Sequence, residues 1–345
     1  MTESEGILVT GASGNLGQLA RFELTPRNRR VWMYRAFAAA MAIGLGFVHS
    51  AQARESTAYP QVVQTNHASP VTAHLFEAFF TAKCAHDVDK TMGFFAPDMV
   101  SYTDATLGWP MPTFEALKGV FANYMPKWPA TGLSYPVRIL GGRQSALVDF
   151  IDTKELFGSE LHVLAAVDIK DGKIVRWIDY WDGDSFDATA YGQVRTASDK
   201  FPRDFQEHKV GEHASVRIRD VSVKLQRALS KADAGAAAAL FSSEAVYEDR
   251  TLNTEILGSA AIQRYLVRVL SSAPFGKDAT LRHVVGGNLG GGFEWVGGPS
   301  SGELSGVTAL ELNGDGKITR LTVVYDGRQL AADSLAKFAA LSLER

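Results

Sequence analysis

A carboxylate between two indoles is the pattern in this 345-residue chain that most clearly points to chemistry. The segment 173–182 reads Lys-Ile-Val-Arg-Trp-Ile-Asp-Tyr-Trp-Asp, and strand alternation places Trp177, Asp179 and Trp181 on one face. Apolar surroundings raise the pKa of a carboxyl group, which suits a general acid or base near neutral pH. We therefore expect Asp179 to line a pocket as a catalytic base, with Trp177 and Trp181 as ligand-binding walls. The alternative is a structural carboxylate on a packed strand.

Several short blocks occur twice in the chain, at a nearly constant separation. Residues 102–107 (Tyr-Thr-Asp-Ala-Thr-Leu) recur as 247–252 (Tyr-Glu-Asp-Arg-Thr-Leu), and 171–176 (Asp-Gly-Lys-Ile-Val-Arg) recur as 315–320 (Asp-Gly-Lys-Ile-Thr-Arg). The same spacing relates Gly141-Gly142 to Gly286-Gly287, and 181–183 to 325–327. A repeat this long predicts two whole domains rather than a solenoid. We place the domains at 54–187 and 216–345, joined by a linker at 188–215.

The order of elements within one copy follows from periodicity and turn signals. Apolar residues at helical spacing predict two helices between 75 and 95, with Asp87 as a cap, and a third helix after Thr113. Extended segments are expected at 100–104, 137–140, 145–153, 161–169 and 174–182, with a hairpin turn at Asp171-Gly172. Helices followed by a run of strands predict an α+β fold, in which a curved, mostly antiparallel sheet wraps about three helices.

This order of elements, with Tyr102 and Asp104 on the first strand and the segment 171–182 closing the copy, resembles the nuclear transport factor 2-like superfamily. Within it, the SnoaL-like polyketide cyclases and the limonene-epoxide hydrolases are most similar. The resemblance covers residues 70–187 and, more weakly, 218–333. It implies two tandem cone-shaped domains, each able to enclose an apolar pocket. It names no single reaction, because this fold hosts enzymes, binding modules and scaffolds alike.

The resemblance to the epoxide hydrolases implies roles for four residues. Asp179 falls on their terminal catalytic Asp and Asp149 on their second, while Tyr102 and Asp104 fall on the Tyr and Asn that hold the attacking water. We therefore expect Asp149 and Tyr102 to face Asp179 inside the first pocket. The structural alternative is that Asp149 and Asp104 are turn or edge carboxylates and that Tyr102 is a core aromatic.

One departure from the hydrolases bears on the reaction. They carry an Arg two residues before the second Asp, where this chain has Leu147, so two ionised acids would repel each other unless they share a proton. An isomerase or cyclase that shuttles a proton needs only one placed base, and it fits the sequence better than a hydrolase. His162, on a neighbouring strand, is either a ligand-binding residue that assists or a packed or surface histidine.

The second copy lacks the central acid. Val323 stands where Asp179 stands in the first copy, although Tyr247 and Asp249 are retained and Glu294 matches Asp149. We expect any catalytic pocket to lie in the first copy. The second copy is expected to cover one face of the first sheet, as an internal pseudo-dimer.

The N-terminal residues show two further patterns. Residues 7–17 (Ile-Leu-Val-Thr-Gly-Ala-Ser-Gly-Asn-Leu-Gly) resemble the glycine loop of short-chain dehydrogenases, but no ribose-binding acid and no Tyr-x-x-x-Lys pair follow. Residues 1–26 are therefore expected to be a vestigial fragment of a dinucleotide fold. Residues 27–53 combine arginines, a short apolar run and Ala51-Gln52-Ala53, which predicts an export signal cut after Ala53. The alternative is a buried or membrane-anchoring helix, and the choice between Sec and twin-arginine export stays open.

The composition of the chain bears on which partners and cofactors it is expected to bind. The net charge of -3 and the lack of a basic stripe argue against nucleic acid. The lone Cys84 excludes an internal disulfide and a cysteine-based metal cluster, and we expect neither a metal nor an organic cofactor. The expected protein is periplasmic or secreted, without a stable membrane span after signal cleavage. Its expected function is that of an isomerase, cyclase or hydrolase acting on a small apolar molecule; the alternative is a ligand-binding or scaffold module without turnover.

Overall fold

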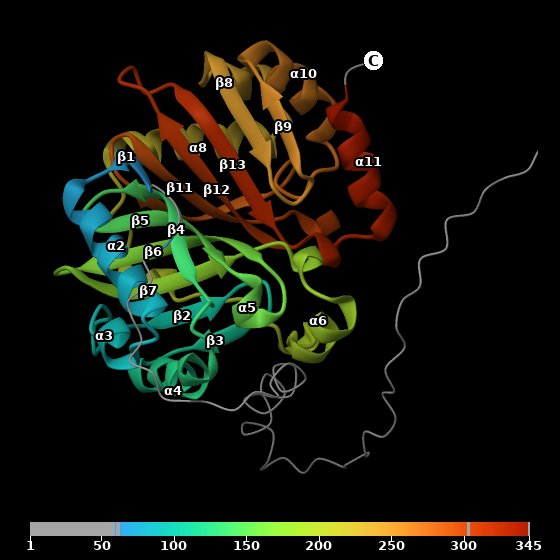
Figure 1. The fold of residues 1–345 in the computed structure, drawn as a ribbon. Coiled ribbons are helices and arrows are strands. Elements are labelled where there is room, and N and C mark those ends of the chain that lie inside the picture. Colours follow the sequence, from blue (N-terminus) through green and yellow to red (C-terminus); the bar gives the residue numbers. More distant parts are fainter. Residues whose placement is uncertain (1–58, 60–62, 302–303, 344–345) are drawn as a thin grey trace, which may run out of the picture.

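The structure, a computed structural model, describes the chain except residues 1–58, 60–62, 302–303 and 344–345. The fragment predicted at 1–26 and the export signal predicted at 27–53 lie outside the described residues. Two sheets, each with its own helices, lie one above the other in Figure 1. None of the helices in the described part is long and apolar enough to cross a membrane.

The first sheet has seven strands in the order β1-β4-β5-β6-β7-β2-β3. Its strands are β1 (Gln64–Ala68), β2 (Ser101–Asp104), β3 (Trp109–Met111), β4 (Ser134–Gly141), β5 (Ser145–Asp152), β6 (Leu161–Lys170) and β7 (Lys173–Tyr180). Its helices are α2 (Pro70–Cys84), α3 (Val88–Met92), α4 (Phe114–Tyr124) and α5 (Lys154–Phe157). Neighbouring strands are antiparallel except for the pairs β1 with β4 and β2 with β7, so the sheet is mostly antiparallel as predicted.

The second sheet has six strands in the order β10-β11-β12-β13-β8-β9. Its strands are β8 (Phe241–Asp249), β9 (Thr254–Leu257), β10 (Thr280–Gly286), β11 (Gly290–Val296), β12 (Ser305–Leu312) and β13 (Ile318–Tyr325). Its helices are α8 (Val216–Ser230), α9 (Ala234–Ala238), α10 (Ser259–Val269) and α11 (Ala332–Ser342). Between the two domains, α6 (Ala188–Val194) and α7 (Glu207–Val210) occupy the predicted linker.

The two sheets repeat one topology. In spatial order, the strands β4-β5-β6-β7-β2-β3 of the first sheet correspond to β10-β11-β12-β13-β8-β9 of the second, and β1 is the additional strand of the first sheet. The repeated blocks occupy equivalent positions, because β2 with Tyr102 runs parallel to β7, and β8 with Tyr247 runs parallel to β13. The predicted α+β fold with two tandem domains is therefore confirmed.

Local signals in the sequence account for several boundaries. The side chain of Asp87 accepts a hydrogen bond from the backbone N–H of Lys90 at the start of α3, and Thr113 caps α4 in the same way. Asp171 and Gly172 have φ angles of 51° and 75°, as a two-residue hairpin turn between β6 and β7 requires. These caps and this turn are where the sequence predicts them.

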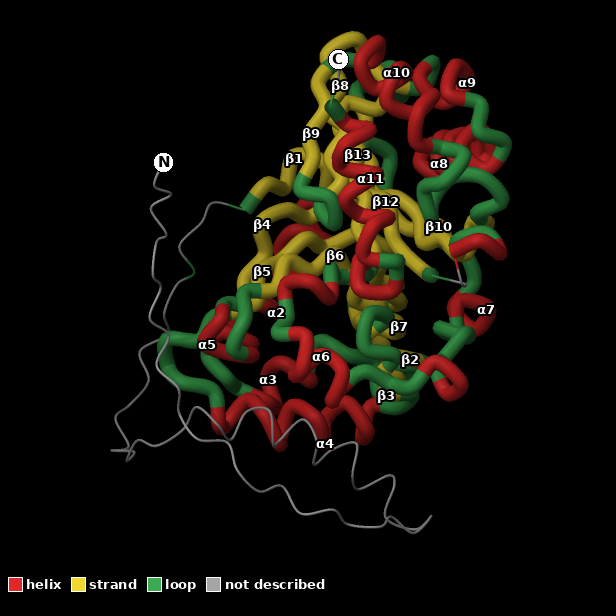
Figure 2. Tube along the Cα trace, turned by 90° about the vertical axis from the view of Figure 1, so that its right-hand side faces the viewer, coloured by secondary structure: helices red, strands yellow, loops and turns green. Residues whose placement is uncertain are grey.

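Strand alternation gives the first sheet two different faces. One face packs on α2, α3 and α4 and forms the core of the first domain, with members such as Val148, Ala165 and Trp177. The other face packs on the second sheet, and this shared core contains Leu147, Leu164, Ile178, Val285, Val307 and Val324. Figure 2 shows the stack from the side, with α4 and α10 at opposite ends. The second domain thus packs against one face of the first sheet, with Phe205 of the linker also in this shared core.

The contact between the domains is reciprocal. The backbone N–H of Gly183 donates to Oδ1 of Asp326 at 3.2 Å, and the N–H of Gly327 donates to Oδ1 of Asp182 at 3.0 Å. Both residue pairs belong to the repeated block at 181–183 and 325–327. Such an exchange of identical contacts is the signature of a two-fold relation, here between two halves of one chain.

Candidate active site

A cavity of about 120 Å³ lies between α4 and the helix-facing side of the first sheet. Its walls are mostly apolar and aromatic, and its lysine and its three aspartates come from α2, β2, β5 and β7. The lining residues are Lys83, Tyr102, Asp104, Leu107, Trp109, Met111, Leu117, Val120, Phe121, Tyr124, Trp128, Asp152, Phe157, Leu161, Val163, Asp179, Trp181, Phe186 and Val194. An apolar cavity with a few convergent polar groups is the usual form of a small-molecule site.

Parallel pairing of β2 with β7 brings the predicted residues together. Tyr102 pairs with Trp177 and Asp104 pairs with Asp179, so all four side chains project from the same face of the sheet. Tyr102, Asp104 and Asp179 line the cavity. Trp177 is fully buried and does not line it, so the expectation that Trp177 forms a ligand-binding wall is wrong. The sequence-based placement of Asp179 and Tyr102 in one pocket agrees with this geometry.

Both carboxylate oxygens of Asp179 accept a hydrogen bond. The hydroxyl of Tyr102 donates to Oδ2 at 2.6 Å, and the indole Nε1 of Trp177 donates to Oδ1 at 2.5 Å. The rings of Tyr102 and Trp177 are stacked, with centroids 5.8 Å apart and an interplanar angle of 4°. The two residues that donate to Asp179 also pack against each other, and together they fix the orientation of the carboxylate.

Burial dominates the acidity of Asp179. Loss of water around the side chain raises its pKa most, the hydrogen bonds from Tyr102 and Trp177 and the charge of Lys83 lower it, and the charge of Asp104 raises it. The net result is a pKa of about 7. A carboxyl group with this pKa exchanges a proton readily at neutral pH. The direction of this shift is the one expected for a carboxyl group in apolar surroundings.

Asp104 is held by a turn as well as exposed to the cavity. Its Oδ1 accepts from the backbone N–H groups of Thr106 (2.9 Å) and Leu107 (2.8 Å), and its Oδ2 accepts from Nε1 of Trp181 (3.1 Å). Burial raises its pKa to about 6 in spite of these three donors. Asp104 thus combines the turn role with a place on the pocket wall.

Asp149 does not enter the cavity, and the expectation that it faces Asp179 is wrong. Across β5, β6 and β7 it pairs with Leu164, which pairs with Tyr180, whereas Asp179 pairs with Ala165. Asp149 therefore projects from the opposite face of the sheet, toward the second domain. The cause is a bulge between β6 and β7 near Asp168, which shifts the register by one residue.

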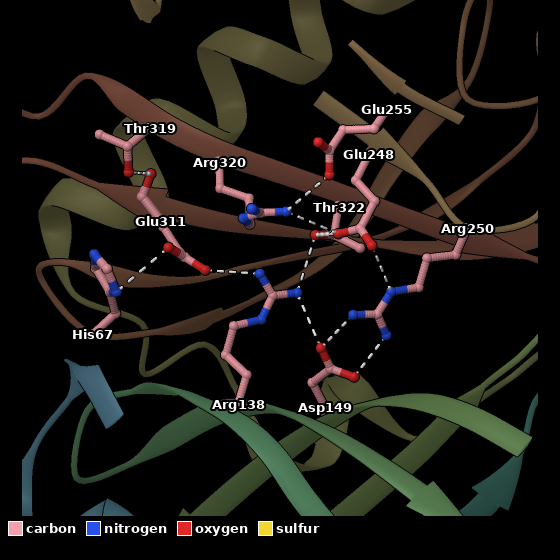
Figure 3. A network of polar contacts seen from close by, with 10 residues as sticks. All are labelled: His67, Arg138, Asp149, Glu248, Arg250, Glu255, Glu311, Thr319, Arg320 and Thr322. Carbon is pink, nitrogen blue, oxygen red and sulfur yellow. Dashed lines mark hydrogen bonds and ion pairs between the residues drawn. The ribbon is translucent and has the colours of Figure 1, made fainter. Parts of the chain in front are cut away.

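At the domain contact Asp149 lies between two guanidinium groups, as Figure 3 shows. Nη2 of Arg138 donates to its Oδ2 at 3.1 Å, and Nη1 of Arg250 donates to its Oδ1 at 2.6 Å. Burial alone would raise the pKa of Asp149, but the charges of Arg250 and Arg138 outweigh it and hold the pKa below its usual range. Asp149 is an ionised structural carboxylate that binds the two domains together.

His162 also lies away from the cavity. It is next to Leu161 and Val163, which line the cavity, so alternation directs it the other way. Its side chain is 50% exposed, and its Nε2 lies 2.9 Å from Oε1 of Glu160. The structure does not support the assisting role expected for this histidine.

Two lining residues that the sequence reasoning missed form an ion pair inside the cavity. Nζ of Lys83 lies 3.4 Å from Oδ1 of Asp152, and their side chains are 5% and 9% exposed. Lys83 continues the helical spacing of Phe76, Phe79 and Phe80, so it belongs to the buried face of α2. A charged residue on that apolar stripe was the signal that could have revealed the pair.

The corresponding region of the second domain is filled by aromatic rings. Tyr247, Tyr265, Phe275, Trp295 and Tyr325 pack on one another there, with ring centroids between 5.3 and 6.5 Å apart. Val323 pairs with Asp249 as Asp179 pairs with Asp104 in the first domain. The second domain therefore keeps the frame of the site without its central carboxylate.

Metal binding has no obvious place in the described part of the chain. Groups of three or more His, Cys, Asp or Glu side chains suited to hold a metal ion are not found among those residues. The three carboxylates that line the cavity are each engaged by protein donors, as given above for Asp104, Asp179 and Asp152.

Comparisons with known proteins return similar solved structures only. The sequence matches no protein-family model and no curated protein. A steroid delta-isomerase from Pseudomonas aeruginosa is 13% identical, and the match covers 38% of this chain and 93% of the isomerase with a TM-score of 0.31. A protein from Shewanella putrefaciens described as a putative SnoaL-like polyketide cyclase is 18% identical, and the match covers 36% of this chain and 88% of that protein with a TM-score of 0.29. At these identities and scores the similarities assign no function to the chain.

Proposed function

We propose that this chain is an exported small-molecule protein whose first domain carries out cofactor-independent acid–base chemistry on a small apolar substrate, with Asp179 as the base. The observation that carries the proposal is the carboxylate of Asp179, buried at the wall of an apolar cavity with a pKa of about 7. At neutral pH a substantial fraction of such a group is ionised and can take a proton. The protonated form can return it to another atom of the same molecule.

The surroundings of Asp179 suit this role. Tyr102 and Trp177 hold both oxygens, so the carboxylate is oriented before a substrate arrives. The apolar walls keep water away from a carbanion or enolate formed next to Asp179. These features favour proton transfer within a bound molecule.

Isomerisation or cyclisation fits the site better than epoxide hydrolysis. The hydrolytic route needs a second acid opposite the first, and Asp149, the residue expected there, lies on the other face of the sheet. Asp152 is paired with Lys83, and Asp104 accepts three hydrogen bonds within its turn and from Trp181. A single base that moves a proton needs none of these groups to act as an acid.

Deuterium exchange tests the proposal without knowledge of the natural substrate. The full chain is incubated with cyclohexanone in deuterated buffer, and loss of the protons next to the carbonyl is followed by NMR. We expect Asp179→Asn to lower the exchange rate by about a hundredfold to ten-thousandfold, the usual contribution of general acid–base catalysis. The matched control is Val323→Asp in the second domain, which should add no exchange because aromatic rings fill that site.

The outcomes separate the two functions considered. Exchange that persists in Asp179→Asn contradicts the role of Asp179. Wild-type protein that binds cyclohexanone but does not exchange its protons contradicts the enzyme and identifies the ligand-binding module instead.

A further inference from the structure

The cavity contains one buried cation whose donors are largely unused. Of the described residues that line it, Lys83 alone carries a positive charge, and its side chain is only 5% exposed. Burying an ammonium group is costly unless charge and hydrogen bonds compensate it. The contacts of Lys83 therefore show whether the protein alone satisfies the group.

Those contacts are few. Oδ1 of Asp152 is 3.4 Å from Nζ of Lys83, at the long end of a hydrogen bond. The ring centroids of Phe150 and Phe80 lie 4.9 Å and 5.8 Å from the same nitrogen, which adds a cation–π attraction. An ammonium has three N–H donors, so at least two remain for a ligand.

Two of the three acidic residues that line the cavity differ from Lys83 in this respect. Both oxygens of Asp179 and both oxygens of Asp104 already accept hydrogen bonds from protein donors. A ligand that brings an acceptor meets the unused N–H groups of Lys83, whereas each of these four oxygens already accepts at least one hydrogen bond from the protein. Lys83 is therefore the lining group that is best placed to bind an oxygen acceptor of a ligand.

Volume limits the rest of the ligand. The cavity of about 120 Å³ is close to the roughly 150 Å³ of an apolar cavity that binds benzene, so it holds a single ring. The apolar walls leave room for one polar group on that ring. A neutral carbonyl oxygen fits better than a carboxylate, because three acidic residues line the same cavity.

We propose that Lys83 is the polar anchor of the cavity and selects small single-ring molecules that carry a carbonyl oxygen. This inference rests on the proposed function, since a carbonyl held by a cation acidifies the neighbouring C–H that Asp179 would deprotonate. In that step the proton passes from carbon to Asp179, and the electron pair moves onto the carbonyl oxygen beside Lys83. Return of the proton to carbon restores the carboxylate and a neutral ligand.

Equilibrium binding of two probes of the same shape tests the inference apart from catalysis. Cyclohexanone carries the carbonyl oxygen, and methylenecyclohexane replaces this oxygen with a CH₂ group. Both are titrated into the full chain, and binding is read from tryptophan fluorescence, because Trp109, Trp128 and Trp181 line the cavity. We expect wild-type protein to bind the ketone about tenfold or more tightly than the alkene, as a hydrogen bond to a charged group allows.

Three variants decide the origin of that ratio. Lys83→Met should bring the ketone-to-alkene affinity ratio to about one, and the double variant Lys83→Met with Asp152→Asn should do the same without an unpaired buried carboxylate. Lys83→Arg, which keeps the charge, should retain a preference for the ketone. Circular dichroism of each variant shows whether it is folded. If Lys83→Met does not fold, the affinity ratio is measured in the double variant instead.

The outcomes are distinct from those of the exchange experiment. A wild-type ratio near one, no binding of either probe, or an undiminished ratio in the folded double variant overturns the anchor. Asp179→Asn should keep the ratio while losing exchange. If Asp179→Asn exchanges normally but Lys83→Met loses the ratio, the proposed function fails and the anchor stands.

Discussion

Arg250 of the second domain donates two hydrogen bonds to Asp149 of the first, and Asp149 lies on the strand whose other face borders the cavity. The carboxylate is almost fully buried, at 2% exposure of its side chain, and Arg250 is 19% exposed. The two domains therefore share a charge pair that neither could complete alone. The second domain stabilises the sheet that carries the candidate site, although it lacks the central acid itself.

Removal of this arginine should destabilise the protein. Arg250→Met leaves Asp149 buried with Arg138 as its remaining partner, and we expect a loss of about 1–3 kcal/mol in the free energy of unfolding. Urea denaturation measures it. The control is Arg320→Met, whose side chain is 33% exposed and bound to Glu248 and Glu255, and which should cost less than about 1 kcal/mol. Equal losses in the two variants would contradict the role given to Arg250.

Asp149→Asn distinguishes a structural carboxylate from a catalytic one. The substitution keeps the shape but leaves the guanidinium groups of Arg138 and Arg250 without their shared anion, and it should cost about 3 kcal/mol of stability. Exchange per folded molecule and the affinity for cyclohexanone should stay within about twofold of wild type, since Asp149 faces away from the cavity. A loss of exchange as large as that in Asp179→Asn would restore Asp149 to the chemistry.

Stability should fall as the pH rises from 5 to 8. Asp104 and Asp182 have pKa values raised to about 6 by burial, and Asp179 and Asp249 to about 7, from an ordinary value of 3.8. The native state therefore holds more protons than the unfolded chain between these values, so the stabilisation present below pH 3.8 is lost as pH rises through about 6 to 7.

His283 acts in the same sense, because Asp168 raises its pKa in the native state despite burial. The lowered pKa of Asp149 gives a stabilisation that is fully present above the ordinary value of 3.8, so it adds no pH dependence in this window. The melting temperature should thus be higher at pH 5.5 than at pH 8, and Asp249→Asn should flatten the slope. A melting temperature that rises across this range would contradict the burial of these carboxyl groups.

Tyr102 tunes the base and should shift the pH dependence when altered. Its hydroxyl donates to Asp179 and lowers the pKa of that carboxyl, so Tyr102→Phe should move the rising limb of the exchange profile to higher pH. Tyr247→Phe, the equivalent change in the second domain, should leave the profile in place. An unchanged profile in Tyr102→Phe would show that the hydroxyl does not act on the base.

Much of the fold could be predicted, because the repeat and the strand alternation are local. Asp171-Gly172 forms the predicted turn, and Asp179 and Tyr102 share a face as the pattern indicates. The position of Asp149 could not be predicted in the same way. If β6 and β7 paired without a bulge from the Asp171-Gly172 turn onward, Asp179 would pair with Leu164. Since Leu164 pairs with Asp149, Asp149 would then lie on the same face of the sheet as Asp179. One extra residue near Val175 reverses that result, and nothing in the local sequence marks it.

Lys83 and Asp152 illustrate a different limit. Lys83 lies on α2 and Asp152 on β5, and the two side chains form an ion pair only when these elements come together in the fold. Their partner relation spans a sequence separation of 69 residues. The chemistry of the cavity therefore depends on tertiary contacts that periodicity along one element does not contain.

The most direct test of the account is the pH dependence of kcat/KM for deuterium exchange into cyclohexanone, compared between wild type and Asp179→Asn. The proton acceptor must be ionised in the free protein, so the wild-type rate should rise with pH along a limb with an apparent pKa of about 7. Asp179→Asn should lose that limb together with most of the rate. A wild-type profile that is flat between pH 5.5 and 8.5, or an Asp179→Asn variant that keeps the limb, would contradict the assignment of Asp179 as the base.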